Sequence, residues 1–231
     1  MKPGLWTDRD SILEPSRVLW GTVNPHRLRI VRTHIARGER ILDVGCARGH
    51  YVKALRELGC RTVGLDLTRH DEWDMLRQGA FVVASVQALP FRDCSFDTVV
   101  AFEVLEHTLD CYAAAAEVAR VSRRLAIASV PNCEIPPEFA TAGLTFYHWT
   151  DPSHRWFFTE KSLESLLRSA GFVSVDIGRI NAVSPAVLFL SSMRLPAALA
   201  TVLGKALRHV PGSRRYCMTL IAVASGKVRA P

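Results

Sequence analysis

The chain has 231 residues, which allows one α/β domain of ordinary size and excludes two domains of that kind. Hydrophobic residues make up 48% of it, enough for a packed core. The formal net charge of +7 and the pI near 9.4 allow anionic partners such as nucleic acid, acidic lipid or phosphorylated sugar. The basic residues are scattered, however, and select none of these partners.

The six cysteines contain no C-x-x-C pair, so neither a zinc knuckle nor a redox motif is indicated. The first fifteen residues lack the apolar core of a signal peptide. We therefore expect reduced thiols in a cytoplasmic protein.

A helix is predicted before the first strand. Asn24 followed by Pro25 is typical of an N-cap and a first helical residue. Gly38 marks the end, so the helix is expected to run to about Arg37.

Residues 40–66 predict a strand, a glycine-containing turn, a helix and a second strand that ends in an acid. The parts are Ile41–Val44, Gly45–Gly49, 51–58 closed by Gly59, and Thr62–Leu65 followed by Asp66. Glycines let a backbone approach a ligand closely, and a terminal acid accepts hydrogen bonds from ribose hydroxyls. The turn reads G-x-x-x-G and lacks the G-x-G-x-x-G of pyrophosphate binders, which favours a nucleoside that carries an amino acid.

Strands and helices alternate through most of the remaining chain. The expected elements are a helix at 71–78, strands at 81–84 and 96–102, a helix at 111–121, a strand at 125–130, a helix at 159–170 capped by Thr159, and strands at 172–177 and 216–225. Two insertions stand apart, at 131–158 and at 181–209. The second is apolar but too interrupted for the ~20 residues of a membrane span. Two short amphipathic helices fit it, either as a flap on the core or as a membrane-surface contact.

Three segments, LDVGCARGHY at 42–51, ALPFRDCSFDTVVAFEVLEH at 88–107 and LLRSAGF at 166–172, resemble the class I S-adenosylmethionine (SAM) methyltransferases, especially small-molecule O-methyltransferases. The resemblance covers roughly residues 40–177. It implies an α/β, Rossmann-like fold with a seven-stranded, mostly parallel sheet and helices on both faces.

The resemblance also implies a set of SAM-binding residues. They are Asp43, Gly45, Cys46, Ala47, Gly49, Asp66, Leu67, Gln87, Ala88, Leu89, Phe102 and Glu103. Ser85 stands where many relatives have an acid that contacts the adenine amine, so Gln87 and the backbone that follows it are expected to replace that contact. Helices before the first strand often cover SAM, so residues 1–38 are expected to form a helical lid on a domain at 39–231. This makes His26 and Arg27 candidate lid residues, although we favour solvated surface charge for both.

The segment at 103–107 reads E-x-x-E-H, and a helical turn there would place both glutamates on one face. Carboxylates and imidazoles suit a divalent cation such as Mg²⁺, Mn²⁺ or Zn²⁺. The second group of polar residues, in HWTDPSHRWFFT, supplies His148, Asp151 and His154. The candidate metal ligands are Glu103, Glu106, His107 and His154, and the candidate catalytic residues are His107, His154 and His148.

The E-x-x-E-H segment is similar to those of ubiquinone-pathway O-methyltransferases and of small-RNA 3′-terminal 2′-O-methyltransferases. In many relatives with no metal, Glu103 would instead position SAM, and His107 would be a base or a packing residue. We predict O-methylation of a small or lipid-linked hydroxyl acceptor, such as a sugar, phenol or quinone precursor, with His107 or His154 as base. The alternatives are a metal-dependent RNA 2′-O-methyltransferase, for which we see no RNA-binding module, and a non-catalytic SAM-binding scaffold that uses 181–209.

Overall fold

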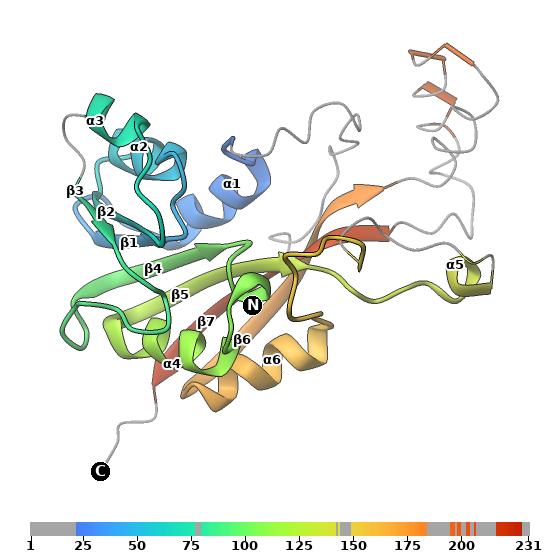
Figure 1. Ribbon diagram of the computed structural model, residues 1–231. Helices are drawn as coiled ribbons and strands as arrows, with labels where there is room; N and C mark the ends of the chain where they lie inside the picture. The colour runs from blue at the N-terminus through green and yellow to red at the C-terminus, as the bar shows by residue number, and fades with distance from the viewer. Residues whose placement is uncertain are drawn as a thin grey trace.

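The computed structural model describes residues 22–76, 80–141, 143, 149–183, 195–196, 198–199, 202–203, 206 and 216–227. Seven strands in this part of the chain form one sheet, in the order β3-β2-β1-β4-β5-β7-β6 (Figure 1). They are β1 (Arg40–Val44), β2 (Arg61–Asp66), β3 (Ala80–Val83), β4 (Phe96–Phe102), β5 (Ser122–Pro131), β6 (Phe172–Val183) and β7 (Tyr216–Lys227). β7 is antiparallel to both of its neighbours, and the other strand pairs are parallel. The predicted fold is confirmed.

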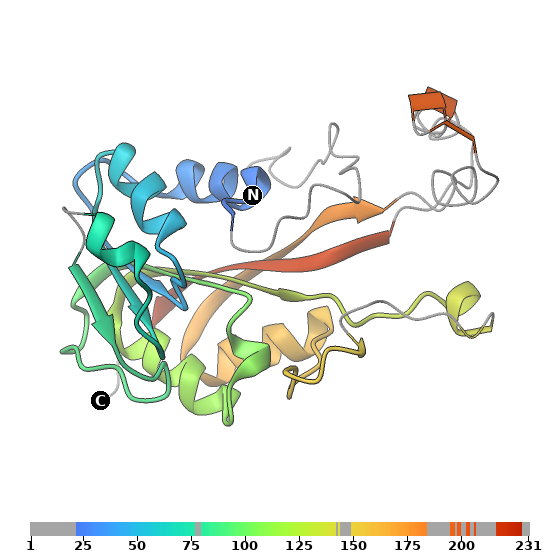
Figure 2. The same ribbon diagram turned by 45° about the horizontal axis from the view of Figure 1, so that its top comes forward.

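Helices cover both faces of the sheet. The helices of the described chain are α1 (Pro25–His34), α2 (His50–Glu57), α3 (Glu72–Met75), α4 (Cys111–Val121), α5 (Pro137–Thr141), which lies beyond the end of the sheet, and α6 (Glu160–Ser169), with a 3₁₀ turn, η2 (Leu105–His107). Figures 1 and 2 show α1 and α2 on one face, with α4 and α6 on the other.

Because both faces are covered, the central strands are apolar on both sides, which is why they appear in the sequence as continuous apolar runs. Along β4, Val99 and Ala101 belong to the core beneath α4 and α6. Val100 and Phe102 alternate with them and belong to the core beneath α1 and α2. Because β1 to β5 are parallel, their carboxyl ends lie at one edge of the sheet.

Two helix starts follow their capping residues. The Asn24 side chain accepts hydrogen bonds from the backbone N–H groups of His26 and Arg27, and Thr159 forms a capping box with Ser162. α1 ends three residues before the predicted Arg37, because Ile35 adopts an extended conformation.

β6 extends six residues beyond its predicted end at Ile177. Pairing with β7 continues to Val183, and the Asn181 side chain donates to Thr219 Oγ1 at 2.9 Å. The first residues of the expected insertion at 181–209 are therefore strand, and most of the remainder lies outside the described residues. Within the described chain, no helix has the length and apolar character needed to cross a bilayer.

Candidate active site at the carboxyl ends of the strands

The glycine turn after β1 packs tightly against the end of β4. Gly45 has a positive φ of 68°, and a Cβ built on it would overlap the Val104 side chain. The Cys46 N–H donates to Leu65 O of β2 at 3.0 Å, and the Gly49 N–H closes the turn on Cys46 O at 2.8 Å. Only glycine fits at residue 45, because Val104 occupies the space that a side chain would take and the backbone has a positive φ.

Asp66 is oriented at the end of β2 by two backbone groups. Its Oδ2 accepts from the Ala47 N–H at 2.9 Å, and its Oδ1 accepts from the Thr68 N–H at 3.1 Å. The neighbouring Leu67 side chain is 70% exposed. An oriented carboxylate beside an exposed apolar side chain suits a ribose joined to a base.

Asp43 is a buried acid directly below this edge. Its Oδ2 has no hydrogen-bond partner among the described residues. Burial, followed by the nearby charge of Asp66, raises the pKa of Asp43 to about 8. Burial also raises the pKa of the Cys46 thiol, with Asp43 adding to it, so this cysteine is not a reactive thiolate.

The loop expected to contact adenine is held by the rest of the fold. Gln87 Oε1 accepts from the Leu109 N–H at 3.1 Å, and the Leu89 N–H donates to Glu117 at 2.7 Å. The Ala88 N–H donates to Ser85 O at 3.2 Å. The loop is therefore pre-organised, and the N–H groups of Ala88 and Leu89 are already engaged inside the protein.

Glu103 faces the N-terminal helix. It has a positive φ of 55°, its N–H donates to Ser129 O, and its Oε1 accepts from Arg27 Nη2 at 2.5 Å. The Arg27 side chain is only 13% exposed, and its guanidinium lies 5.7 Å from the centre of the Phe102 ring. Our interpretation of Arg27 as solvated surface charge is therefore wrong, because the docking of α1 brings it onto this ion pair.

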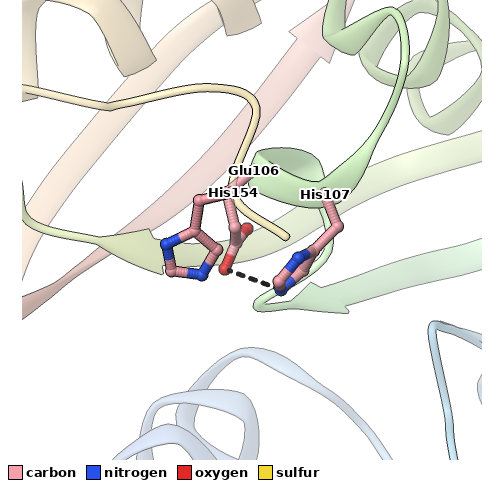
Figure 3. Close-up of side chains that lie close together, drawn as sticks. All are labelled: Glu106, His107 and His154. Carbon is pink, nitrogen blue, oxygen red and sulfur yellow. Dashed lines mark ion pairs between the residues drawn. The ribbon is translucent and has the colours of Figure 1, made fainter. Parts of the chain in front are cut away.

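Glu106 faces a different group of side chains. The 3₁₀ turn begins at Leu105, so the two glutamates do not share a helical face as expected. Glu106 is fully buried, and neither of its carboxyl oxygens has a hydrogen-bond partner among the described residues. His107 Nε2 lies 4.0 Å from Glu106 Oε1, and the His107 and His154 ring centres are 4.8 Å apart (Figure 3). Burial, and next the charge of Glu103, raises the pKa of Glu106 well above its usual value.

The segment that carries His154 is joined to η2 by several hydrogen bonds. The backbone N–H groups of Arg155 and Trp156 donate to Glu106 O at 2.8 and 3.2 Å, and the Trp156 indole donates to Thr108 O at 2.9 Å. His154 Nε2 lies 3.8 Å from Asp151 Oδ2. His148, the third catalytic candidate, lies outside the described residues.

The surroundings of His107 assign its tautomer. Its Nδ1 lies 3.2 Å from the carbonyl oxygen of Ser153, which can only accept, so we place the proton of the neutral ring on Nδ1. Nε2 then carries the lone pair and faces Glu106. The His107 side chain is 40% exposed, so an incoming molecule can reach it. This arrangement can remove a proton from a bound hydroxyl group.

Known proteins share both the sequence pattern and the fold. A family profile described as "Methyltransferase domain" matches residues 23–177. The chain belongs to this family, within the class I SAM-dependent methyltransferases. It is 32% identical over 164 residues to "O-methyltransferase cnsE" of Penicillium expansum, across 64% of this chain and 56% of that protein. It is 28% identical over 193 residues to "Ubiquinone biosynthesis O-methyltransferase" of Xanthomonas euvesicatoria pv. vesicatoria, across 74% of this chain and 77% of that protein.

Solved protein structures share the fold of this methyltransferase. The YcgJ protein of Bacillus subtilis superposes with a TM-score of 0.61 at 18% identity, covering 89% of this chain and 100% of that one. A SAM-dependent methyltransferase from Archaeoglobus fulgidus has a TM-score of 0.60 at 19% identity, covering 87% and 91%. The chain spans only about half the length of the cnsE relative, so that protein's activity does not transfer directly.

Proposed function

We propose that this methyltransferase uses SAM to methylate a hydroxyl oxygen on a small or lipid-linked acceptor. The observation that carries the proposal is the buried Glu106 beside His107 and His154, at the end of β4. Transfer to oxygen benefits from a base that removes the hydroxyl proton, and these residues supply one next to the strand edge that fits SAM. The names of the two sequence relatives, both O-methyltransferases, support the same reaction class.

The strand edge fits each part of SAM. The turn at Gly45 provides the close backbone approach, and Asp66 with Leu67 suits the ribose and the adenine. The Asp43 Oδ2 is buried with no hydrogen-bond partner among the described residues, and a cationic ligand would favour the ionised form of this carboxyl group. When bound, SAM supplies an activated methyl group on a positively charged sulfur.

The amino-acid end of SAM carries both an ammonium and a carboxylate. Arg27 and Glu103 place opposite charges 2.5 Å apart, and Val104, the residue after Glu103, touches the Gly45 turn. A guanidinium pairs with a carboxylate, and a carboxylate pairs with an ammonium. We infer that the ion pair opens to hold both ends of this zwitterion, and that α1 thereby covers the site.

The direct test is a search for the methylated product. Purified protein is incubated with isotope-labelled SAM and cell extracts, and separately with phenols, quinols and sugars. Mass spectrometry should find a labelled product heavier than its precursor by one methylene group. If the protein binds SAM and labels nothing in any extract, it is a SAM-binding scaffold and the proposed activity is wrong.

A first mutational prediction concerns Asp66. Asp66→Ala should weaken SAM binding by about 1–3 kcal/mol, because the ribose hydroxyls lose their acceptor. Calorimetric titration measures this, with Glu57→Ala, an exposed carboxylate on α2, as the matched control. Equal SAM affinity in wild type and Asp66→Ala would contradict the ribose placement.

A metal-dependent enzyme is the second candidate, favoured by a specific group of side chains. Glu106, His107 and His154 have ligand atoms within 4.8 Å of one another, and two imidazoles with one carboxylate suit Zn²⁺, Mn²⁺ or Fe²⁺. Ligands at about 2.1 Å from one ion are at most about 4.2 Å apart, and about 3.4 Å apart in tetrahedral geometry, so the longest separation in this group must shorten by about 0.6 to 1.4 Å when an ion binds. Glu103, expected as a ligand, is not in the group.

Metal analysis decides between the two candidates. After dialysis against Zn²⁺ or Mn²⁺ and desalting, the metal-dependent enzyme should retain about one ion per chain, and the isosteric Glu106→Gln variant should retain none. Chelators should then abolish methyl transfer and added metal restore it. Full activity in metal-free protein would leave the histidine base as the mechanism. An RNA acceptor would add a steep salt dependence of binding, which a small acceptor lacks.

A further inference from the structure

Ala47 occupies a backbone position that normally requires glycine. It is the first central residue of the turn that the Gly49 N–H closes on Cys46 O, and its φ is +43°. The second central residue, Arg48, does not have a positive φ. This sign pattern is that of a type II′ turn, in which the first central residue is preferentially glycine. A side chain there is strained and must be held by its surroundings.

Two hydrogen bonds from outside the turn hold Ala47. Its carbonyl oxygen accepts from the Trp73 indole Nε1 at 2.7 Å, and its N–H donates to Asp66 Oδ2 at 2.9 Å. Each of the two peptide groups that flank the Ala47 Cα is thereby fixed by one of these bonds. The second of these bonds orients the acid that we assign to the ribose.

Trp73 is itself rigidly placed behind the turn. It is only 6% exposed and stacks on Phe81 of β3, with ring centres 4.7 Å apart and planes inclined by 12°. The Phe81 ring in turn packs where Gly49 and Gly64 lack side chains: a Cβ on Gly64 would lie 2.7 Å from it. The indole N–H is therefore presented to Ala47 by a packed cluster of α3 and β3.

We propose that Trp73 is a positioning residue for SAM binding, which substitutes for the glycine missing at residue 47. Its indole N–H keeps Ala47 at its positive φ, and the Ala47 N–H then keeps Asp66 aligned for the ribose. Trp73 acts through Ala47 and Asp66 and does not touch the ligand. The inference rests on the proposed use of SAM, because the property that it explains is SAM affinity.

A double-mutant cycle separates this role from simple packing. Trp73→Phe removes the indole N–H but keeps an aromatic ring against Phe81, and Ala47→Gly removes the strain that the indole opposes. Trp73→Phe should weaken SAM binding about 3- to 10-fold in the wild-type background, the range expected for one lost hydrogen bond. In the Ala47→Gly background the same change should cost less than about twofold, because glycine adopts this positive φ without strain.

Stability measurements distinguish the packing contribution. Loss of ring volume at Trp73 should reduce the free energy of unfolding equally in the wild-type and Ala47→Gly backgrounds. The loss of SAM affinity should instead be larger in the wild-type background. Cys94→Gly is the matched control, because Cys94 is exposed and also has a positive φ, of 54°, in a turn away from the SAM residues. It should relieve backbone strain without rescuing Trp73→Phe. Trp73→Tyr serves in the same cycle should Trp73→Phe not fold.

The outcomes are distinct. An equal loss of SAM affinity from Trp73→Phe in both backgrounds, or no loss in either, overturns the positioning role while wild-type SAM binding stands. A wild-type protein that does not bind SAM or its demethylated product overturns the proposed function instead.

Discussion

Replacing His107 with alanine should lower the rate of methyl transfer about 10²- to 10⁴-fold and leave SAM affinity within about twofold. The reason is geometric. Nε2 carries the lone pair and the side chain is 40% exposed, so the ring can take up the proton of a bound hydroxyl group while its Nδ1–H stays hydrogen-bonded to the Ser153 carbonyl oxygen. Most of the SAM residues lie on the Gly45 turn, at the end of β2 and in the loop at 87–89, and Glu103, at the end of β4, is paired with Arg27. We expect isotope-labelled methyl transfer to fall while calorimetric SAM binding persists.

Matched variants make this test specific. His107→Gln keeps a polar side chain but provides no base, so it should be as slow as His107→Ala. His34→Gln is the control, because His34 ends α1 near the amino edge of the sheet, beside Arg124 of β5. Added imidazole should partly restore His107→Ala, since the side chain it replaces is 40% exposed. Retention of at least half the wild-type rate by His107→Ala would remove His107 from the mechanism.

The sequence predicts the strands and most helices because their signals are local. The apolar run Phe96–Phe102 predicts β4 with its observed bounds, and Thr159 predicts the start of α6. β6 is longer than predicted, because Gly178, Arg179 and Asn181 interrupt the apolar pattern of its last six residues, which are held by pairing with β7. No local pattern contains the Asn181–Thr219 contact that stabilises them.

The candidate site was only partly predictable, because contacts between segments far apart in the sequence decide which charged side chains lie together. E-x-x-E-H was predicted at the end of β4 and lies there, but Glu103, with its positive φ, is paired with Arg27, while Glu106 lies beside His107 and His154. The pairing of His154 with His107 depends on the N–H groups of Arg155 and Trp156 reaching Glu106 O. These contacts join segments about fifty residues apart, and periodicity carries no information about them.

The role of Trp73 in holding the turn at Ala47 was not predicted from the sequence. A signal was present, since an alanine stands where a tight turn favours glycine. Such a departure predicts that something else holds the turn, but the residue that does so is identified only in three dimensions.

Replacing Asp43 with asparagine should stabilise the ligand-free protein relative to wild type, and the difference in the free energy of unfolding should increase as pH rises. Burial raises the pKa of Asp43 from 3.8 to about 8, so between these values the folded protein holds one proton more than the unfolded chain. The free energy of unfolding then falls with rising pH, by at most about 1.4 kcal/mol per pH unit from this group. Asparagine does not titrate, so its advantage over wild type should grow by up to about 3 kcal/mol from pH ~5.5 to pH ~8.

The same substitution should act in the opposite direction on SAM binding. A buried carboxyl group that destabilises the empty protein is explained if a cationic ligand offsets its charge, so Asp43→Asn should bind SAM about tenfold more weakly. Binding to the wild type near pH 7 should also release a proton, which calorimetry in two buffers of different ionisation enthalpy detects. Urea unfolding at several pH values measures the effect on the free energy of unfolding, and Asp71→Asn, at an exposed aspartate, is the control. Parallel pH profiles for wild type and Asp43→Asn would refute the buried ionisation, and unchanged SAM affinity would remove Asp43 from the cofactor site. Asp43→Asn should therefore raise the free energy of unfolding of the empty protein and lower its affinity for SAM. This combination is expected only of a residue whose ionised form destabilises the empty site and stabilises the occupied one.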